Sequence, residues 1–182
     1  MLNTRYFIFP LQGGKTMPIQ NPYTLGNAWF VDKVQYVNNA NEEIESLHKV
    51  MPAKVAVVDK KFAEQVKPVA VSDSLRFVKL VAYEPNDLKY EVSSEKGGVV
   101  VFSEIYYPDG WHVTIDGQPA ELARADYILR TMYVPAGQHT IEMRFDPTSL
   151  HVTEGIAYGA LALLVIGIIV AVLITKRKYV KA

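Results

Sequence analysis

Aromatic residues gather in one segment of the sequence, between residues 106 and 145, and their side chains are the ones best suited to binding chemistry. Flat aromatic rings with polar edges suit stacking against sugar rings. An arginine fork pairs readily with phosphate or carboxylate groups. The candidate glycan contacts in this segment are Tyr106, Tyr107, Trp111, Tyr127 and Arg130.

Ordinary packing explains the same aromatic residues equally well. Trp111 alternates with Val113 and Ile115, which is the period of a strand with one buried face. Tyr107 stands next to the turn at residues 108–110, where an aromatic side chain often packs locally. We therefore keep a glycan platform and a packing role as two open interpretations.

The two arginines of this segment present a similar choice. Arg124 and Arg130 suit an acidic glycan or a phosphate. They also suit structural ion pairs with Asp126 or Glu121, which lie nearby in the sequence.

No other group of residues indicates catalysis or metal binding. The absence of cysteine excludes disulfides, thiolate metal sites and cysteine nucleophiles. Gly14-Lys15-Thr16 resembles the end of a phosphate-binding loop, but Phe9 stands where that motif requires glycine. We expect no catalytic residue, no metal and no cofactor. The histidines are scattered, without ligand spacing to one another or to a carboxylate; they are His48, His112, His139 and His151.

The charge of the chain is unevenly distributed. The sequence holds 19 basic and 19 acidic residues, but four of the bases lie within residues 176–182. Residues 1–154 therefore carry 15 basic and 19 acidic residues. A mildly acidic body without a basic stripe excludes nucleic acid as a partner.

The C-terminal region contains a candidate membrane span from Gly155 to Thr175. These 21 residues carry no charge, and as a helix they would measure about 31 Å, which matches a hydrocarbon core of about 30 Å. Glu154 precedes the span and the basic tail at residues 176–182 follows it, so we expect a cytoplasmic C-terminus and an extracytoplasmic body. Small residues at four-residue spacing suggest that the helix packs against others. They are Gly155, Gly159, Gly167 and Ala171.

The expected orientation requires export of residues 1–154, yet the N-terminal sequence has no signal-peptide pattern. One explanation is that Met1 is an internal residue of a longer chain whose earlier helices carry the body across. Another is a tail-anchored cytoplasmic protein. We prefer the first explanation.

Residues 1–66 mix strand and helix signals and are predicted to form a small α/β unit, and the sequence leaves open whether this unit is complete at its N-terminal edge. Residues 6–9 are an apolar run, and residues 12–22 read as a loop. Strands are predicted at 29–37 and 54–58. Between them we expect a helix from Asn41 to about residue 50, with Ile44, Leu47 and Met51 on its buried face.

Residues 67–74 are the predicted linker, and beyond them the pattern is that of an antiparallel β-sandwich over residues 75–150. Turn residues separate its strands at Gly97-Gly98, Asp116-Gly117 and Pro135-Ala136-Gly137. The fold class is therefore mainly β with a small α/β N-terminal part and one C-terminal transmembrane helix. The predicted strands cover residues 76–83, 88–94, 99–106, 111–115, 127–134 and 138–145.

Three motifs in this region resemble the C-terminal end of the YfhO family of bacterial multi-pass membrane proteins. They are Y-Y-P-x-G-W-x-V-T-I-D-G, R-A-D-Y-x-L-R and V-P-A-G-x-H-T-I-E-x-R-F, followed by an apolar helix. The stretches L-N-T-R-Y-F-I and G-N-A-W-F-V look like the preceding region of the same family.

The resemblance implies a protein of the bacterial cytoplasmic membrane, related to glycosyltransferases that use polyprenyl-phosphate sugar donors. In such enzymes the catalytic carboxylates lie on loops between early membrane helices, so no catalytic residue is carried over to this chain. The implied partners are membrane lipid, other transmembrane helices and a glycan or polyprenyl-phosphate-linked sugar. The leading hypothesis is a non-catalytic module that assists envelope glycan transfer, and the alternative is a module that scaffolds membrane partners.

Overall fold

The computed structural model describes residues 1–67 and 75–180. It divides the chain into two compact units, Met1–Phe145 and Asp146–Ala182. The predicted linker at residues 67–74 lies, apart from Lys67, outside the described residues. The division of the first unit at that linker stays a prediction.

One sheet of the first unit has five strands in the order β10-β9-β13-β7-β6, all antiparallel. Its long strand β13 shows the expected alternation, because Ile141 and Met143 are fully buried whereas Glu142 and Arg144 are exposed. The sheet therefore has one packed face and one wet face. The strands are β6 (Phe77–Glu84), β7 (Asp87–Ser94), β9 (Trp111–Ile115), β10 (Gln118–Ala120) and β13 (Gly137–Phe145).

The second sheet has four antiparallel strands in the order β11-β12-β8-β3. Side chains of the two sheets form a shared core that includes Tyr90, Phe102, Met132 and Ile141. The rings of Tyr90 and Phe102 meet edge to face, 4.9 Å between centroids. This packing confirms the predicted β-sandwich. The strands are β3 (Ala28–Val31), β8 (Gly98–Ile105), β11 (Ala123–Ala125) and β12 (Leu129–Val134).

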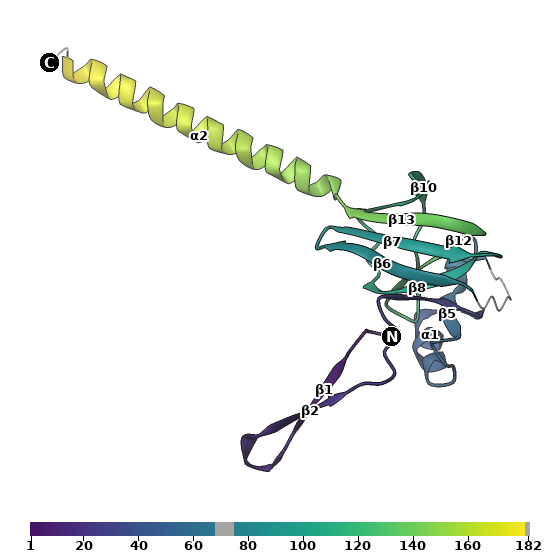
Figure 1. The fold of residues 1–182 in the computed structure, drawn as a ribbon. Coiled ribbons are helices and arrows are strands. Elements are labelled where there is room, and N and C mark those ends of the chain that lie inside the picture. Colours follow the sequence, from purple (N-terminus) through teal and green to yellow (C-terminus); the bar gives the residue numbers. More distant parts are fainter. Residues whose placement is uncertain (68–74, 181–182) are drawn as a thin grey trace. The chain divides into compact units, whose positions relative to one another are not determined.

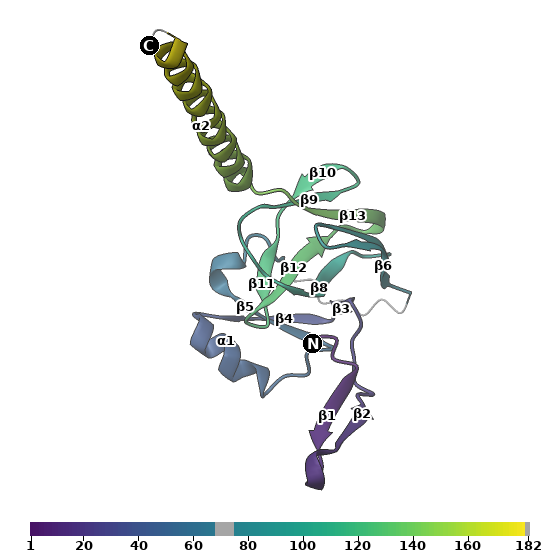
Figure 2. The same ribbon diagram turned by 90° about the vertical axis from the view of Figure 1, so that its left-hand side faces the viewer.

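A third layer covers the other face of the four-stranded sheet (Figures 1 and 2). It consists of the parallel pair β4 (Lys33–Val37) and β5 (Val55–Asp59), helix α1 (Ala40–Leu47) and the short 3₁₀ helix η2 (Lys60–Phe62). Strand β8 is consequently buried on both sides. Val99 and Val101 pack with the third layer, while Val100 and Phe102 pack with the five-stranded sheet.

A buried polar cluster joins the third layer to the sandwich. Glu43 of α1 is fully buried, and its carboxylate accepts hydrogen bonds from Arg124 Nη2 at 2.6 Å and from the Tyr127 backbone N–H at 2.8 Å. Asp126 Oδ1 accepts from the Val57 N–H of β5 at 2.8 Å. Burial raises the pKa of Asp126 to about 6, even though the Val57 hydrogen bond lowers it. Charged side chains therefore lie at the interface between the third layer and the sandwich, where apolar side chains would be expected.

Four local predictions about residues 1–66 were wrong. The predicted strand 29–37 is broken at Asp32, because β3 pairs with β8 whereas β4 pairs with β5. The helix begins after Asn39, since Asn39 Oδ1 accepts from the Glu42 N–H at 3.0 Å and Glu42 Oε2 accepts from the Asn38 N–H at 3.0 Å.

The buried face of this helix also differs from the prediction. Ile44 and Met51 are 43% and 60% exposed, and Glu43 is buried instead. Sequence periodicity misplaced the face because the ion pair with Arg124 outweighs the apolar pattern of one short helix.

The predicted loop at 12–22 contains a strand. Strand β1 (Tyr6–Pro10) and strand β2 (Thr16–Gln20) form a two-stranded antiparallel ribbon, which turns through the 3₁₀ segment η1 (Gln12–Gly14). Gly13 and Gly14 have φ angles of 79° and 77°, a conformation in which glycine is unstrained. Gly14-Lys15-Thr16 therefore belongs to a hairpin tip and the start of a strand.

The second unit consists of helix α2 (Thr148–Val180). The predicted span, residues 155–175, lies inside this helix, and Thr148–Ile174 is long and apolar enough to cross a membrane. None of the most apolar part is buried within the chain. A Cβ atom added at Gly155, Gly159 or Gly167 would meet nothing within 4 Å. Packing of other helices against these glycines and Ala171 stays a prediction.

The buried pair between Glu43 and Arg124 yields a prediction about stability. Arg124→Ala leaves a fully buried carboxylate without its cation, so we expect a loss of about 3 to 5 kcal/mol in the free energy of unfolding. Lys89→Ala is the matched control, because the Lys89–Glu142 pair is 45% and 50% exposed and is expected to contribute about 1 kcal/mol or less. Urea unfolding of the full chain in detergent micelles measures both. Equal losses would contradict the structural role of the cluster.

Candidate functional site

The aromatic segment forms a pocket at the end of the sandwich that carries β9 and β10. Tyr106 and Tyr107 contribute from the loop before β9, Trp111 contributes from the first position of β9, and Glu121 follows β10. The cavity has a volume of about 240 Å³. Tyr107 is 53% exposed, so its ring is available to a ligand. The complete lining is Tyr106, Tyr107, Pro108, Trp111, Val113, Ala120, Glu121 and Leu122.

Arg130 supports this pocket from within the protein. Its guanidinium carbon lies 3.8 Å from the centroid of the Trp111 ring, and its Nε donates to the Ile105 carbonyl at 3.0 Å. The residue is only 4% exposed, and burial lowers the pKa of its guanidinium. A cation at this distance covers one face of the indole. The Phe145 ring also packs on Trp111, 5.2 Å between ring centroids, so only the remaining part of the indole is left for the pocket.

The five predicted glycan contacts fall into three places. Tyr106, Tyr107 and Trp111 share the pocket. Arg130 lies behind Trp111. Tyr127 lies outside the pocket, with its ring centroid 5.7 Å from the guanidinium carbon of Arg124. Tyr106 is also held by Phe62, 5.7 Å between ring centroids. As ligand contacts, all five stay predictions.

The arginine partners differ from those considered in the sequence. Arg124 pairs with Glu43, 81 positions away, and Arg130 pairs with an aromatic ring and a backbone carbonyl. Sequence proximity to Asp126 and Glu121 was a poor guide, because antiparallel strands bring distant segments into contact.

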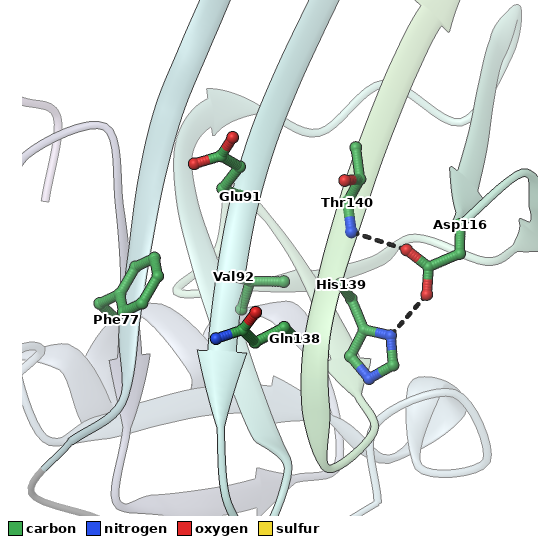
Figure 3. A pocket seen from close by; sticks show the side chains of 7 residues that line it. All are labelled: Phe77, Glu91, Val92, Asp116, Gln138, His139 and Thr140. Carbon is green, nitrogen blue, oxygen red and sulfur yellow. Dashed lines mark hydrogen bonds and ion pairs between the residues drawn. The ribbon is translucent and has the colours of Figure 1, made fainter.

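A second pocket, of about 250 Å³, lies over strands β6, β7 and β13 (Figure 3). Phe77, Glu91 and Gln138 line it together with a pair of titratable side chains, Asp116 and His139. His139 Nδ1 lies 2.6 Å from Asp116 Oδ2. Sequence reasoning found no carboxylate near a histidine, because these two residues are 23 positions apart and meet only through the pairing of β9 with β13.

Both ring nitrogens of His139 face acceptors. Nε2 lies 3.1 Å from the Ala136 carbonyl, while Nδ1 faces Asp116. The hydrogen bond to Asp116 raises the pKa of His139, and the same bond, with that from the Thr140 N–H, lowers the pKa of Asp116. A doubly protonated imidazolium satisfies both acceptors. In that form no ring nitrogen is left to accept a proton from a substrate. The pair acts as a clamp between two turns, because His139 contacts both Asp116 and the Ala136 carbonyl.

The clamp is built by turn chemistry. Asp116 and Gly117 have φ angles of 51° and 78°, as a two-residue hairpin loop between β9 and β10 requires. This conformation directs the Asp116 carboxylate toward β13, where Thr140 and His139 bind it. Among residues 1–67 and 75–180, no group of three histidine, aspartate or glutamate side chains is placed to hold a metal ion.

The architecture and the span together define a membrane-anchored β-sandwich protein. A family model described as bacterial membrane protein YfhO matches residues 62–157, which include both pockets, the Arg124–Tyr127 turn and the start of α2. The chain belongs to this family, and it is therefore a membrane protein. No curated protein and no solved structure matches it.

The clamp leads to a prediction about proton binding. Asp116→Asn removes the charge that favours the imidazolium, so the pKa of His139 should fall toward the ordinary value of about 6.5. Because the raised pKa favours the protonated form in the folded state, the clamp stabilises the fold below pH 6.5, and this contribution disappears as the pH rises through the His139 pKa. NMR titration of the His139 ring protons measures the shift. Asp109→Asn is the control, and an unchanged His139 pKa in Asp116→Asn would contradict the clamp.

Proposed function

We propose that this chain is an extracytoplasmic module of a YfhO-family membrane protein, which holds a glycan or the sugar part of a lipid-linked donor beside the membrane. The observation that supports this most is the pocket that brings Tyr106, Tyr107 and Trp111 together. Aromatic faces stack on the apolar faces of sugar rings, and the tyrosine hydroxyls and the Glu121 carboxylate can pair with sugar hydroxyls.

The residues that line the pocket limit the chemical class of the proposed ligand. It contains no lysine or arginine among the described residues, because Arg130 is buried behind Trp111. A phosphate would therefore find no cation there, whereas an uncharged sugar ring fits. The pocket has one carboxylate, Glu121. Since glycosidic chemistry commonly uses a pair of carboxylates, this supports a binding role without catalysis by the module itself.

Orientation is part of the proposal. Acidic Glu154 precedes the apolar stretch and basic residues at 176–178 follow it. Basic residues are retained on the cytoplasmic side. We therefore place the C-terminus in the cytoplasm and the first unit outside it.

Binding is tested on the full chain in detergent micelles by calorimetric titration with a neutral oligosaccharide and with a short-chain polyprenyl-phosphate sugar. Tyr107→Ala removes an exposed ring without touching the core. A stacking contribution of about 0.5 to 1.5 kcal/mol predicts an affinity loss of roughly two- to tenfold. Trp111→Phe tests the second ring while keeping an aromatic partner for Arg130.

Tyr83→Ala is the matched control, because Tyr83 is 63% exposed on β6 and lies outside the pocket. If neither sugar binds, or if Tyr83→Ala weakens binding as much as Tyr107→Ala does, the glycan proposal fails. The scaffolding alternative would then be favoured.

Orientation is tested by protease treatment of spheroplasts that make the chain in its natural genetic context. We expect digestion of the sandwich and protection of the C-terminal tail. Inverted vesicles from the same cells should show the opposite pattern. Protection of the sandwich in spheroplasts would contradict the proposed orientation and would favour a tail-anchored cytoplasmic protein.

A further inference from the structure

The hairpin of β1 and β2 exposes an apolar surface that neither pocket uses. All five residues of each strand are exposed. Isolated two-stranded ribbons are at best marginally stable in water, so a ribbon with this composition gains from a partner. The segment before its base is held by the body, since Asn3 Nδ2 donates to Asn27 Oδ1 at 3.2 Å and Ser103 Oγ donates to the Met1 carbonyl at 2.7 Å.

The register places Phe7, Phe9, Met17 and Ile19 together on one face of the ribbon, and Tyr6, Ile8, Pro10 and Pro18 on the opposite face. Phe7 pairs with Ile19, and Phe9 pairs with Met17. Directly opposed residues share a face, and the rings of Phe7 and Phe9 meet at 6.4 Å on this one. These four side chains, here called the ribbon face, are between 43% and 49% exposed. Leu11, 47% exposed, extends the apolar surface to the tip.

The charge around the ribbon face is opposite to that of the rest of the body. Residues 1–31 contain Arg5 and Lys15 and no acidic residue, whereas residues 32–154 contain 13 basic and 19 acidic residues. Arg5 precedes β1, and Lys15 follows the turn at the tip. An apolar surface rich in aromatic residues and flanked by cations fits the boundary between lipid headgroups and acyl chains.

We propose that the ribbon face docks on the surface of an anionic phospholipid bilayer, with Phe7, Phe9, Met17 and Ile19 at the acyl boundary and Arg5 and Lys15 at the headgroups. Membership of a membrane-protein family and the apolar helix α2 ensure that a bilayer is available to the same chain. The proposal is independent of the glycan pocket and of which leaflet is involved.

A second copy of the chain fits the hairpin less well. Pro10 and Pro18 deprive both strands of a backbone N–H, which hinders strand addition at either edge. Pairing two ribbon faces would also bring Arg5 and Lys15 of both copies together. A bilayer takes the apolar side chains and compensates the positive charges.

The test uses the absence of cysteine, which makes a single introduced cysteine a unique labelling site. Phe9→Cys in the full chain is labelled with an environment-sensitive fluorophore and reconstituted into vesicles of zwitterionic phospholipid, with or without an equal amount of anionic phospholipid. We expect blue-shifted emission that nitroxide-labelled lipids quench, more strongly in the anionic vesicles. Arg5→Gln combined with Lys15→Gln should remove that extra quenching.

Lys96→Cys, in the turn between β7 and β8, is the matched control and should stay in a water-like environment. Leu11→Cys reports from the tip if Phe9→Cys disturbs the ribbon. The proposal is overturned if the labels at Phe9 and Leu11 remain water-like in both kinds of vesicle, or if they are quenched no more than the label at Lys96. It is equally overturned if the blue shift occurs without quenching by the labelled lipids and grows with protein density together with energy transfer between labels, because the occupant would then be a second copy.

Discussion

Burial of strand β8 on both faces is the constraint on which the first unit depends. Val100 and Phe102 contact the five-stranded sheet, while Val99 and Val101 contact the third layer. An antiparallel sheet commonly keeps one face wet, so a strand of this kind requires two covering layers. The α/β elements near the N-terminus are therefore needed to keep the four-stranded sheet dry, and Glu43, Asp126 and Arg124 fix them in position.

The residues that carry the family resemblance mostly make connections between segments. Asp116 of the first motif binds His139 of the third. Arg130 of the second motif stacks on Trp111 of the first. The Arg124–Tyr127 turn binds α1 and β5. The exposed ring of Tyr107 is different, because it lines a pocket and its side chain is left available to a ligand.

Short-range patterns predicted the parts of the fold that depend on local chemistry. Alternation in β9 and β13, turn residues at Asp116-Gly117 and the uncharged stretch at 155–175 all led to correct elements. Tyr106, Tyr107 and Trp111 were placed together because they are close in sequence. Glu43 and Arg124 could not be paired in this way, since their contact depends on how a third layer packs on a sheet. The start of α1 was missed because three asparagines compete for the cap, and only Asn39 has a glutamate three positions later, Glu42, which accepts from the Asn38 N–H and from Asn39 Nδ2.

The turn from Arg124 to Tyr127 limits which amino-acid substitutions the protein can accept there. Asp126 and Tyr127 have φ angles of 51° and 73°, a region that costs most side chains of order 1 kcal/mol or more and that glycine enters freely. Glycine at position 126 would relax the backbone but remove the carboxylate that receives the Val57 N–H. Glycine suits the backbone at position 126 best, but it cannot make the hydrogen bond that joins the turn to β5 of the third layer. A more stable turn has to keep the Asp126 carboxylate, whereas Tyr127 binds Glu43 through its backbone N–H, which glycine would also supply.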